Sequence, residues 1–377
     1  MKKIVKLLIC LLMLVVVVGC TKTNEPENTP EDSVEEKTGM NIMFVVTGSL
    51  GGGNNVDDVK AAIDEYVATY GGSVNTAECK MDTSIYQSTL ETAADSGEYD
   101  LIVTGFGSMV EALCNTAKEY PDQKFLLFDA AINYAENDVP NCVSVQALGN
   151  QGGFLAGALA ALLTSSEDAE YANDKKVVGF IGATESTAIL DFFFGYVDGV
   201  KYVDEETEIL YSFVGSQTDS ALTQELAIAQ NGTDADVIFA ATNSDLAVAD
   251  AATDKGFYAI CCDTDEAASI AGTNADEAAH IVTSVIKDYK GMVYPMLEQI
   301  GNGTVAWGTH SYISYAQGGV RLADNEWFKA AVPAAVMEQY EKVVADLAAG
   351  NLSVSTAYGA DEAAVNAKKA LCSEKTN

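Results

Sequence analysis

The chain has 377 residues, of which 48% are hydrophobic, and this length exceeds the roughly 250 to 300 residues beyond which a single core stops growing, so we expect two lobes. Its 21 lysines and arginines stand against 55 aspartates and glutamates, and the net charge of −34 argues against binding to nucleic acid or to anionic lipid headgroups through a basic patch. Two histidines and eight cysteines without a CxxC pair supply neither a zinc cluster nor a Ser-His-Asp triad, so we expect no metal and no cofactor.

The N-terminus has the pattern of a secretory signal. Three lysines at positions 2, 3 and 6 precede an unbroken run of twelve apolar residues, Leu7–Val18. Because about 20 apolar residues are needed to span a bilayer, this run is short for a transmembrane helix and fits the apolar region of a signal peptide. We therefore predict that residues 1–19 are a signal peptide.

The residues that follow indicate a lipid anchor. The apolar run ends in Val-Val-Gly-Cys at residues 17–20, which resembles the bacterial lipobox, whose cysteine is diacylated and becomes the first residue after cleavage. Residues 20–39 contain many acids and no aromatic residue, so they cannot bury enough surface to fold. We predict a lipidated Cys20, a flexible tether over 20–39 and a location at the cell membrane on its extracytoplasmic face. The alternative is a cysteine that follows an apolar run by chance.

From residue 40 the sequence alternates between apolar, strand-like runs and stretches with apolar residues at helical spacing. In chain order we predict a strand at 41–46, a helix at 56–70, a strand at 73–79, a helix at 84–95, a strand at 99–105, a helix at 108–119 and strands at 124–129 and 141–147. The pattern then restarts with a helix at 152–163, after which strands at 176–182, 208–215, 236–242 and 257–263 alternate with helices at 187–202, 219–230 and 245–255. This alternation predicts an α/β fold with parallel sheets covered on both faces.

The segments that follow the predicted strands are rich in Gly, Ser, Thr, Asn and Asp. They read TGSLGGGNN, TGFGS, FDAAI, FIGATES, VGSQTDS, ATNSD and CDTDE. In open α/β sheets ligands bind beyond the carboxyl ends of the strands. We therefore expect these segments to line a cleft between the two lobes and to bind a small polar ligand.

Several segments of this region resemble one protein family in their order and spacing. They are TGFGSMVEALCNTAKEYPDQKFLLFDA, NQGGFLAGALAALLT, VVGFIGATESTAILDFFFGYVDGVKYV, DADVIFAATNSDLAVADAATDKG and IVTSVIKDY. From about Met40 to about Arg321 the chain is similar to the basic membrane protein family, lipid-anchored substrate-binding proteins of ABC transporters, several of which bind purine nucleosides. The resemblance implies the type I periplasmic-binding-protein fold, in which two Rossmann-like lobes joined by crossover strands close on a ligand about a hinge.

The resemblance also implies how the chain is divided and what it contacts. Residues 40–146, together with a helix around 275–300, are expected to form the first lobe. Residues 147–270 and about 303–377 are expected to form the second. The implied partners are a nucleoside-like small molecule, an ABC permease and, through the lipid anchor, the membrane.

Family members that bind nucleosides hold the base between aromatic rings and the ribose hydroxyls with carboxylates, close to a lysine. By position, the acid after the fourth strand is Asp129, and the acid pair of the family's Gly-Val-Asp segment is Asp263 and Asp265. The lysine of the Thr-Ser-x-x-Lys segment is Lys287, which we expect within a helix. Because an ionised carboxylate accepts hydrogen bonds from two neighbouring hydroxyls, these residues suit a sugar-bearing ligand.

The chain departs from the family at the positions of its stacking aromatics. In the first loop, TGSLGGGNNVDD, Gly48 lies near a family aspartate, Val56 at a phenylalanine and Asp57 at an asparagine. In the second lobe Gln217 stands at the other aromatic position. A purine therefore cannot be held between rings at these two positions. The candidate replacements are Phe106, Tyr86 and Phe192.

Polar residues of the same loops complete the predicted ligand site. Asn54 and Asn55 follow three glycines, which allow the backbone to approach a ligand closely, and Asn243 lies where the family has a glycine-rich turn. The predicted ligand-binding residues are Asn54, Asn55, Asp57, Phe106, Asp129, Gln217, Asn243, Asp263, Asp265 and Lys287.

Structural interpretations of the same residues remain open. The three acids at 129, 263 and 265 can cap helices, the two asparagines can form a turn, and the phenylalanines at 192–194 can be packing residues. The glycines at 51–53 lack the GK[ST] of a phosphate-binding loop, and the acids lack the spacing of an EF-hand. We expect the six cysteines beyond residue 20 to be mostly small buried hydrophobic residues.

The sequence leaves more than one function open. The leading hypothesis is an extracytoplasmic solute-binding lipoprotein that captures a nucleoside or a related small polar ligand for an ABC importer. The alternative is a ligand-sensing receptor that uses the same fold to signal to a membrane partner. An enzyme is not expected, because the candidate cleft residues lack a nucleophile paired with a base.

Overall fold

A computed structural model describes residues 39–51 and 55–374. The predicted signal peptide, the lipidated Cys20 and nearly all of the predicted tether lie outside the described residues, as does the predicted ligand residue Asn54. Within the described ranges, no helix combines the length and the apolar character that crossing a membrane requires.

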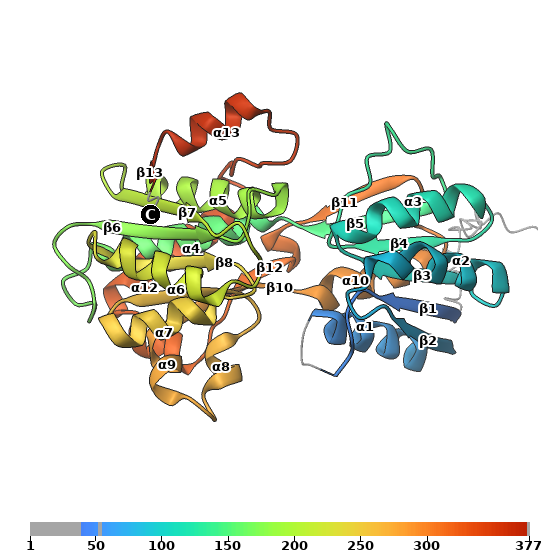
Figure 1. The fold of residues 1–377 in the computed structure, drawn as a ribbon, viewed down its shortest axis with the longest axis horizontal. Coiled ribbons are helices and arrows are strands. Elements are labelled where there is room, and N and C mark those ends of the chain that lie inside the picture. The colour runs from blue at the N-terminus through green and yellow to red at the C-terminus, as the bar shows by residue number, and fades with distance from the viewer. Residues whose placement is uncertain (1–38, 52–54, 375–377) are drawn as a thin grey trace, which may run out of the picture. The chain divides into compact units, whose positions relative to one another are not determined.

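The first sheet has six parallel strands in the order β11-β5-β4-β3-β1-β2 (Figure 1). The strands are β1 (Met40–Val46), β2 (Gly72–Glu78), β3 (Leu101–Gly105), β4 (Phe125–Phe128), β5 (Cys142–Ala147) and β11 (Thr309–Ile313). The helices that accompany them are α1 (Asn55–Tyr70), η1 (Thr83–Ile85), α2 (Tyr86–Ser96), η2 (Gly107–Met109), α3 (Val110–Glu119) and α10 (Tyr289–Gly301).

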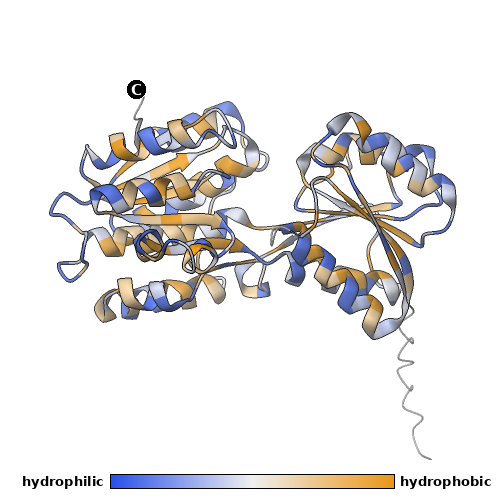
Figure 2. Cartoon of the chain, turned by 60° about the horizontal axis from the view of Figure 1, so that its bottom comes forward, coloured by the Kyte–Doolittle hydropathy of each residue, from blue (hydrophilic) through white to orange (hydrophobic). Residues whose placement is uncertain are grey.

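Alternation along the strands gives this sheet a core on each face. Phe44 packs with α1 and α10, whereas its neighbour Val45 packs with α2 and α3. Successive side chains of a strand point to opposite faces, so a strand buried on both sides must be apolar throughout. In Figure 2 the strands are accordingly mostly hydrophobic, and the hydrophilic residues lie largely on helices and loops.

The second sheet has seven strands in the order β12-β10-β9-β8-β6-β7-β13, all parallel except β12. Its strands are β6 (Val177–Gly182), β7 (Glu208–Phe213), β8 (Ala235–Ala241), β9 (Tyr258–Asp263), β10 (Ile281–Lys287), β12 (Val320–Leu322) and β13 (Ser373–Glu374). The remaining helices are α4 (Gly149–Thr164), α5 (Thr187–Val203), α6 (Ser220–Asn231), α7 (Leu246–Lys255), α8 (Glu266–Ile270), α9 (Ala275–His280), η3 (Tyr315–Gln317), α11 (Glu326–Ala331), α12 (Ala334–Ala348) and α13 (Glu362–Lys369). One face of the sheet packs on α4, α5 and α12, and the other on α6 to α9.

The predicted α/β class is confirmed, and one predicted element is wrong. In place of a single helix around 275–300, the chain forms α9, then β10 in the second sheet, then α10 against the first sheet. The physical reason is the run Ile281–Lys287, which is rich in β-branched residues and buried at every position, as suits a strand covered on both faces. Residues 303–377 are also divided differently from the expectation, because β11 pairs with β5 of the first sheet.

Helices α4 and α5 approach so closely that glycines form their contact surface. A Cβ atom added to Gly195 would lie 1.8 Å from the backbone oxygen of Asn150, and one added to Gly157 would lie 2.1 Å from that of Tyr196. A Cβ atom added to Gly153 would lie 2.2 Å from the backbone oxygen of Phe192, and one added to Gly199 would lie 2.0 Å from that of Phe154. The small-residue pattern of α4 therefore reflects backbone-to-backbone packing with α5.

Residues 350–361, which we call the C-terminal strap, are fastened to α4 and α5 by a buried carboxylate. Asp191 is 1% exposed and accepts hydrogen bonds from the backbone N–H of Asn150 (2.9 Å), the hydroxyl of Thr356 (2.5 Å) and the backbone N–H of Ala357 (3.0 Å). Burial raises the pKa of Asp191, and these hydrogen bonds oppose the rise. One aspartate thus ties the strap to the α4–α5 pair.

A second carboxylate and one tyrosine extend this attachment. Asp198 accepts from the backbone N–H (2.8 Å) and the hydroxyl (2.6 Å) of Ser355, and also from the ammonium of Lys368 (2.5 Å). The side-chain amide of Gln146, near the end of β5, donates to the hydroxyl of Tyr358. The strap therefore reaches the point at which the chain leaves the first sheet.

Asp236 in β8 gives the fold a testable pH dependence. It is 2% exposed, and burial raises its pKa to about 6 from 3.8. The folded protein keeps this proton to higher pH than the unfolded chain, so the free energy of unfolding falls between about pH 4 and about pH 6 and stays lower above that window. We expect Asp236→Asn to flatten this part of the profile and to raise stability at pH 7 by up to about 3 kcal/mol.

Urea unfolding of both proteins across this pH range measures the effect. A wild-type free energy of unfolding that does not fall over the window, or a variant less stable than wild type at neutral pH, would contradict the prediction.

The described cysteines behave largely as predicted. Cys79, Cys114, Cys142, Cys261 and Cys262 are buried, and Cys372 is partly exposed. Burial raises the pKa of the Cys142 thiol, and likewise that of Cys261. These thiols are accordingly held in the unreactive protonated form and act as small apolar side chains.

Candidate functional site

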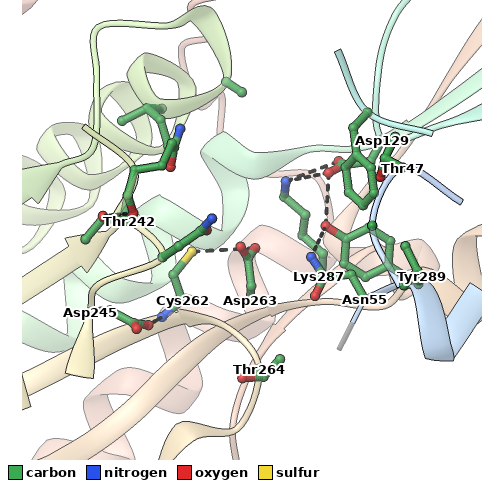
Figure 3. A pocket seen from close by; sticks show the side chains of 18 of the residues that line it. Thr47, Asn55, Asp129, Thr242, Asp245, Cys262, Asp263, Thr264, Lys287 and Tyr289 are labelled. Atoms are coloured by element: carbon green, nitrogen blue, oxygen red, sulfur yellow. Dashed lines mark hydrogen bonds and ion pairs between the residues drawn. The ribbon is translucent and has the colours of Figure 1, made fainter. Parts of the chain in front are cut away.

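A pocket of about 500 Å³ lies at the carboxyl ends of strands from both sheets. This is the position that parallel α/β sheets offer for ligands. Figure 3 shows the side chains that converge there. The residues that line the pocket include Gly48, Asn55, Met81, Phe106, Asp129, Phe192, Gln217, Asn243, Asp263, Lys287 and Tyr289.

The centre of the pocket is a buried ion pair between Lys287 and Asp129. The ammonium of Lys287 donates to both carboxylate oxygens of Asp129 at 3.1 Å, and the hydroxyl of Tyr289 donates to one of them at 3.0 Å. The two charged side chains are only 10% and 7% exposed. The side-chain amide of Asn55 donates to the Tyr289 hydroxyl at 3.1 Å and extends the chain of contacts (Figure 3).

The local sequence explains how these groups meet. Lys287 is the last residue of β10 and Tyr289 the first of α10. Between them Asp288 caps α10 by accepting from the backbone N–H of Gly291 at 2.7 Å, which fixes the change from strand to helix. The expectation that Lys287 lies within a helix was wrong, because β10 ends there.

Electrostatics keeps the lysine and the tyrosine protonated. Burial lowers the pKa of Lys287, but the nearby carboxylates of Asp129 and Asp263 outweigh burial, so the pKa is raised overall. Burial raises the pKa of Tyr289 well above its ordinary value, and Asp129 adds to the rise. Both residues therefore remain hydrogen-bond donors at any physiological pH.

Asp263 is the acceptor left available to a ligand. Among the described residues, the group that approaches its carboxylate as a donor is the weakly donating thiol of Cys262, at 3.8 Å. Burial raises the pKa of Asp263, the charge of Lys287 opposes the rise, and the charge of Asp129 adds to it. A carboxylate this poorly satisfied gains free energy when a ligand hydroxyl donates to it.

Four residues of the pocket lining, Met81 among them, adopt backbone conformations that non-glycine residues rarely take. Phe106, Asp129 and Asp263 have φ angles of 71°, 49° and 66°, and they follow β3 and β4 or end β9. Left-handed backbone costs free energy for residues with a Cβ atom, and it is concentrated at functional sites. Here the strained positions aim one ring and two carboxylates into the same pocket.

The wall from the second sheet combines carboxamides with one buried ring. Gln217 and Asn243 are exposed and line the pocket, and the hydroxyl of Thr242 donates to the backbone oxygen of Gln217 at 3.1 Å. The Lys287 ammonium lies 5.4 Å from the centre of the Phe192 ring, which is 3% exposed. This wall therefore offers both hydrogen-bonding groups and an aromatic surface.

Most predicted site residues that the structure describes are brought together, and two are not. The residues that line the pocket are Asn55, Phe106, Asp129, Gln217, Asn243, Asp263 and Lys287. Asp57 instead accepts from the backbone N–H of Gly51 at 2.7 Å, beside the start of α1. Asp265 caps α8 and also accepts from the side chain of Asn325 at 2.8 Å. The capping interpretation of Asp265 is therefore confirmed, and both carboxylates are engaged outside the pocket lining.

The suggested aromatic replacements divide in the same way. Phe106 and Phe192 line the pocket, whereas Tyr86 is 2% exposed and packs in the core beneath α2 and α3. The suggestion that Tyr86 serves the ligand was wrong, because burial on the far face of the first sheet keeps it from the pocket. Phe193 and Phe194 are core residues, as the packing interpretation predicted.

Sequence reasoning missed several polar residues of the pocket, and three of them are Tyr289, Asp245 and Glu266. Each lies at or just beyond the carboxyl end of a strand, and ATNSD and CDTDE were already singled out as such segments. Asp245 is 6% exposed and accepts from the backbone N–H of Cys262 at 2.9 Å, so it holds the ends of β8 and β9 together. Burial raises its pKa well above the ordinary value.

Metal binding finds no support in the described part of the chain, where no group of histidine, cysteine, aspartate and glutamate side chains is arranged to hold an ion. The pocket lining itself offers hydrogen-bonding groups, charged groups and apolar surface. This combination is that of a binding site for a polar organic ligand.

Comparison with known proteins places this geometry in a family. Residues 40–349 match the family described as "ABC transporter substrate-binding protein PnrA-like" (Bmp). The chain belongs to the Bmp family. This confirms the resemblance to basic membrane proteins.

Curated relatives of the Bmp family share about two fifths of their length with this chain. The "ABC transporter nucleoside-binding protein BmpA" of Lactococcus lactis is 30% identical over 156 residues, which are 41% of this chain and 40% of that protein. "Basic membrane protein A" of Borreliella burgdorferi is 27% identical over 157 residues, 41% and 43% of the two chains. An "uncharacterized lipoprotein" of Pyrococcus furiosus is 29% identical over 150 residues, 38% and 35%.

Solved structures confirm the fold of this Bmp family member. A solute-binding protein of an ABC transporter system from Aeropyrum pernix K1 superposes with a TM-score of 0.68 at 19% identity, and the match covers 88% of this chain and 98% of that one. A second, from Conexibacter woesei, gives a TM-score of 0.64 at 20% identity over 84% and 99%. The predicted periplasmic-binding-protein fold is thus confirmed.

Proposed function

We propose that this protein is the lipid-anchored, extracytoplasmic substrate-binding component of an ABC importer and that its ligand is a nucleoside or a closely related sugar-bearing molecule. The single observation that carries the proposal is the cluster of Asp129, Lys287, Tyr289 and Asp263 in a pocket lined by both sheets. The cluster presents charged acceptors and fixed donors together, as recognition of neighbouring hydroxyls requires.

The arrangement gives the two carboxylates different tasks. Asp129 already accepts from Lys287 and Tyr289, so it is held rigidly and keeps part of its acceptor capacity for the ligand. Asp263 has most of its acceptor capacity free, and it takes the ligand's hydroxyl hydrogens most directly. A ribose with two adjacent hydroxyls satisfies such an acceptor, while Phe106 adds apolar surface to the lining.

The chain path supports capture by closure of the two sheets on the ligand. The chain passes between the sheets after β5, between β10 and α10, and between β11 and β12. Short crossing segments of this kind act as hinges when a ligand joins the two walls. We propose that a bound ligand bridges Asp263 on one wall and Asp129 on the other, and so favours the closed state.

The signal-like N-terminus and Cys20 support the anchor, and a relative from Pyrococcus furiosus carries the name lipoprotein. The name of the Lactococcus lactis relative, nucleoside-binding, supports the ligand class. Delivery to a permease follows from the ABC transporter family. Deleting the gene is expected to abolish uptake of the ligand by cells. If binding in vitro is intact and uptake is unaffected, the sensing alternative takes its place.

A ligand screen by thermal unfolding tests the assignment. Purine and pyrimidine nucleosides, free bases and D-ribose are added to the purified protein, and the nucleosides are expected to raise the unfolding midpoint. A ligand at about 1,000 times its dissociation constant stabilises the folded state by about 4 kcal/mol. If no nucleoside or sugar moves the midpoint, the ligand assignment is wrong.

The two neighbouring aspartates provide a matched pair of variants. Asp263→Asn is expected to weaken nucleoside binding at least tenfold, because a neutral amide accepts ligand hydroxyls less strongly than a carboxylate. Asn also tolerates the left-handed backbone at this position. Asp265→Asn is expected to bind as wild type does, because that residue caps α8 and Asn is an equally good cap. Equal loss in both variants would contradict the assignment of Asp263.

A further inference from the structure

The turn that follows β2 holds an unusual backbone against the pocket. Lys80 and Met81 are consecutive non-glycine residues in the left-handed region, with φ angles of 52° and 63°. The turn is pinned to the end of β1: the backbone N–H of Lys80 donates to the oxygen of Gly48 at 3.1 Å, and that of Met81 to the oxygen of Thr47 at 2.6 Å. The fold therefore maintains two costly conformations at the edge of its ligand site.

This turn places a large apolar side chain on the pocket. Met81 lines the pocket and yet is 71% exposed. Its sulfur would lie 3.7 Å from a Cβ atom added to Gly48. The thioether thus covers Gly48, the position near which the resemblance to the family puts an aspartate. A longer side chain at this position would compete with Met81 for the same space.

The pocket also needs an apolar surface on this side. The two aromatic positions expected of nucleoside-binding family members are Val56 and Gln217 in this chain, and both line the pocket. Phe106 packs edge-on against Phe128, with ring centres 5.3 Å apart, and Phe192 is nearly fully buried beside Lys287. Among the described lining residues, the large apolar side chain that is most exposed is therefore Met81.

We propose that Met81 is the residue that selects ligands with an aromatic base, by packing its thioether against the ring in place of the missing phenylalanine. Sulfur is polarisable, and methionine packs favourably against aromatic rings while adapting to their shape. This inference rests on the proposed function and adds the group that distinguishes a nucleoside from its free sugar. The pinned, strained turn fixes the backbone position from which the Met81 side chain reaches the pocket.

A single exposed methionine is ordinary on a protein surface. The test must therefore compare Met81 with an exposed apolar residue that does not line the pocket. Ile85 provides the matched control: it is a neighbouring apolar residue, 38% exposed, and it does not line the ligand pocket. Met81→Ala removes the thioether and keeps a Cβ atom in the same turn, whereas Met81→Leu keeps the apolar bulk without sulfur. The control variant is Ile85→Ala. Because all three variants change exposed side chains, they are expected to fold as wild type does.

Calorimetric titration with inosine, uridine and D-ribose distinguishes the outcomes. Met81→Ala is expected to weaken inosine binding about three- to tenfold and to leave D-ribose binding unchanged, whereas Met81→Leu retains most of the inosine affinity and Ile85→Ala all of it. Inosine affinity that is unchanged in Met81→Ala, or an equal loss for inosine and D-ribose, overturns the role of Met81 while the proposed function stands. Failure of the wild-type protein to bind any of the three probes overturns the ligand assignment and the role of Met81 together.

A second readout needs no substitution. Dilute hydrogen peroxide converts the exposed thioether to the sulfoxide, and mass spectrometry follows the rate at Met81. Saturating inosine is expected to slow this oxidation several-fold, and D-ribose is expected to slow it much less. Unchanged oxidation of Met81 under conditions where calorimetry shows inosine bound would contradict the contact.

Discussion

Replacing Lys287 with alanine is expected to lower the free energy of unfolding by about 3 to 5 kcal/mol and to abolish detectable binding of inosine. The ammonium is hydrogen-bonded to both oxygens of Asp129, and the two side chains are only 10% and 7% exposed. Removing one member of such a pair leaves an uncompensated buried charge, which is far more costly than losing an exposed pair. Urea unfolding at neutral pH measures the stability, and calorimetry the binding.

Two further variants show whether burial is the cause. Lys176 pairs with Asp204 at 2.8 Å, but its side chain is 45% exposed, so Lys176→Ala is expected to cost less than about 1 kcal/mol. The double variant Asp129→Asn with Lys287→Met removes both charges and is expected to recover much of the lost stability without recovering binding. If Lys287→Ala lowers the free energy of unfolding no more than Lys176→Ala does, burial does not set the cost of breaking the Lys287–Asp129 pair, and the prediction is wrong.

Replacing Gly195 with alanine is expected to destabilise the protein by about 3 kcal/mol or more. The added methyl carbon would lie 1.8 Å from the backbone oxygen of Asn150, and a backbone atom inside a helix pair cannot move aside cheaply. Alanine favours a helix over glycine by about 1 kcal/mol, which acts in the opposite direction. The clash is expected to outweigh that gain, because α4 and α5 must separate to admit the methyl group.

Gly272→Ala is the control, since in the described part of the chain no heavy atom beyond its two sequence neighbours lies within 4 Å of the added Cβ atom. It is expected to change the free energy of unfolding by less than about 0.5 kcal/mol, as for most surface substitutions. Thermal and urea unfolding of the two variants side by side give the difference. Similar midpoints would show that α4 and α5 repack without strain.

The alternation of apolar runs with helical stretches predicted most of the fold from residue 40 to residue 263. Each predicted strand from 41–46 to 257–263 corresponds to a strand of the structure within a few residues. The strands beyond residue 263, β10 to β13, were not predicted. Strand β10 was expected to be helical because an apolar run flanked by helical stretches has no periodicity that separates a buried strand from a helix. The β-branched composition of Ile281–Lys287 was the remaining sequence signal for a strand. It was overlooked because a single helix was expected around 275–300.

The site was predictable only in part, because loop chemistry does not reveal backbone conformation. Asp263 and Asp265 are equivalent in sequence, yet a positive φ aims the first into the pocket and a cap turns the second onto α8. Tyr289 becomes visible only when the strand end at Lys287 is known. Met81 carries no signal in the sequence, since its position depends on a turn formed by two residues that rarely adopt left-handed backbone.

The C-terminal strap has a practical consequence for anyone preparing this protein. The match to the family ends at residue 349, so a boundary drawn from the family alone would discard the strap and α13. Trimming there would strip Asp191 of Thr356 and Ala357, and Asp198 of Ser355 and Lys368. A shortened version would thus leave Asp191 with the backbone N–H of Asn150 and would remove the strap and α13 partners of Asp198. Poor yield or aggregation of such a version would reflect the cut rather than the binding domain itself.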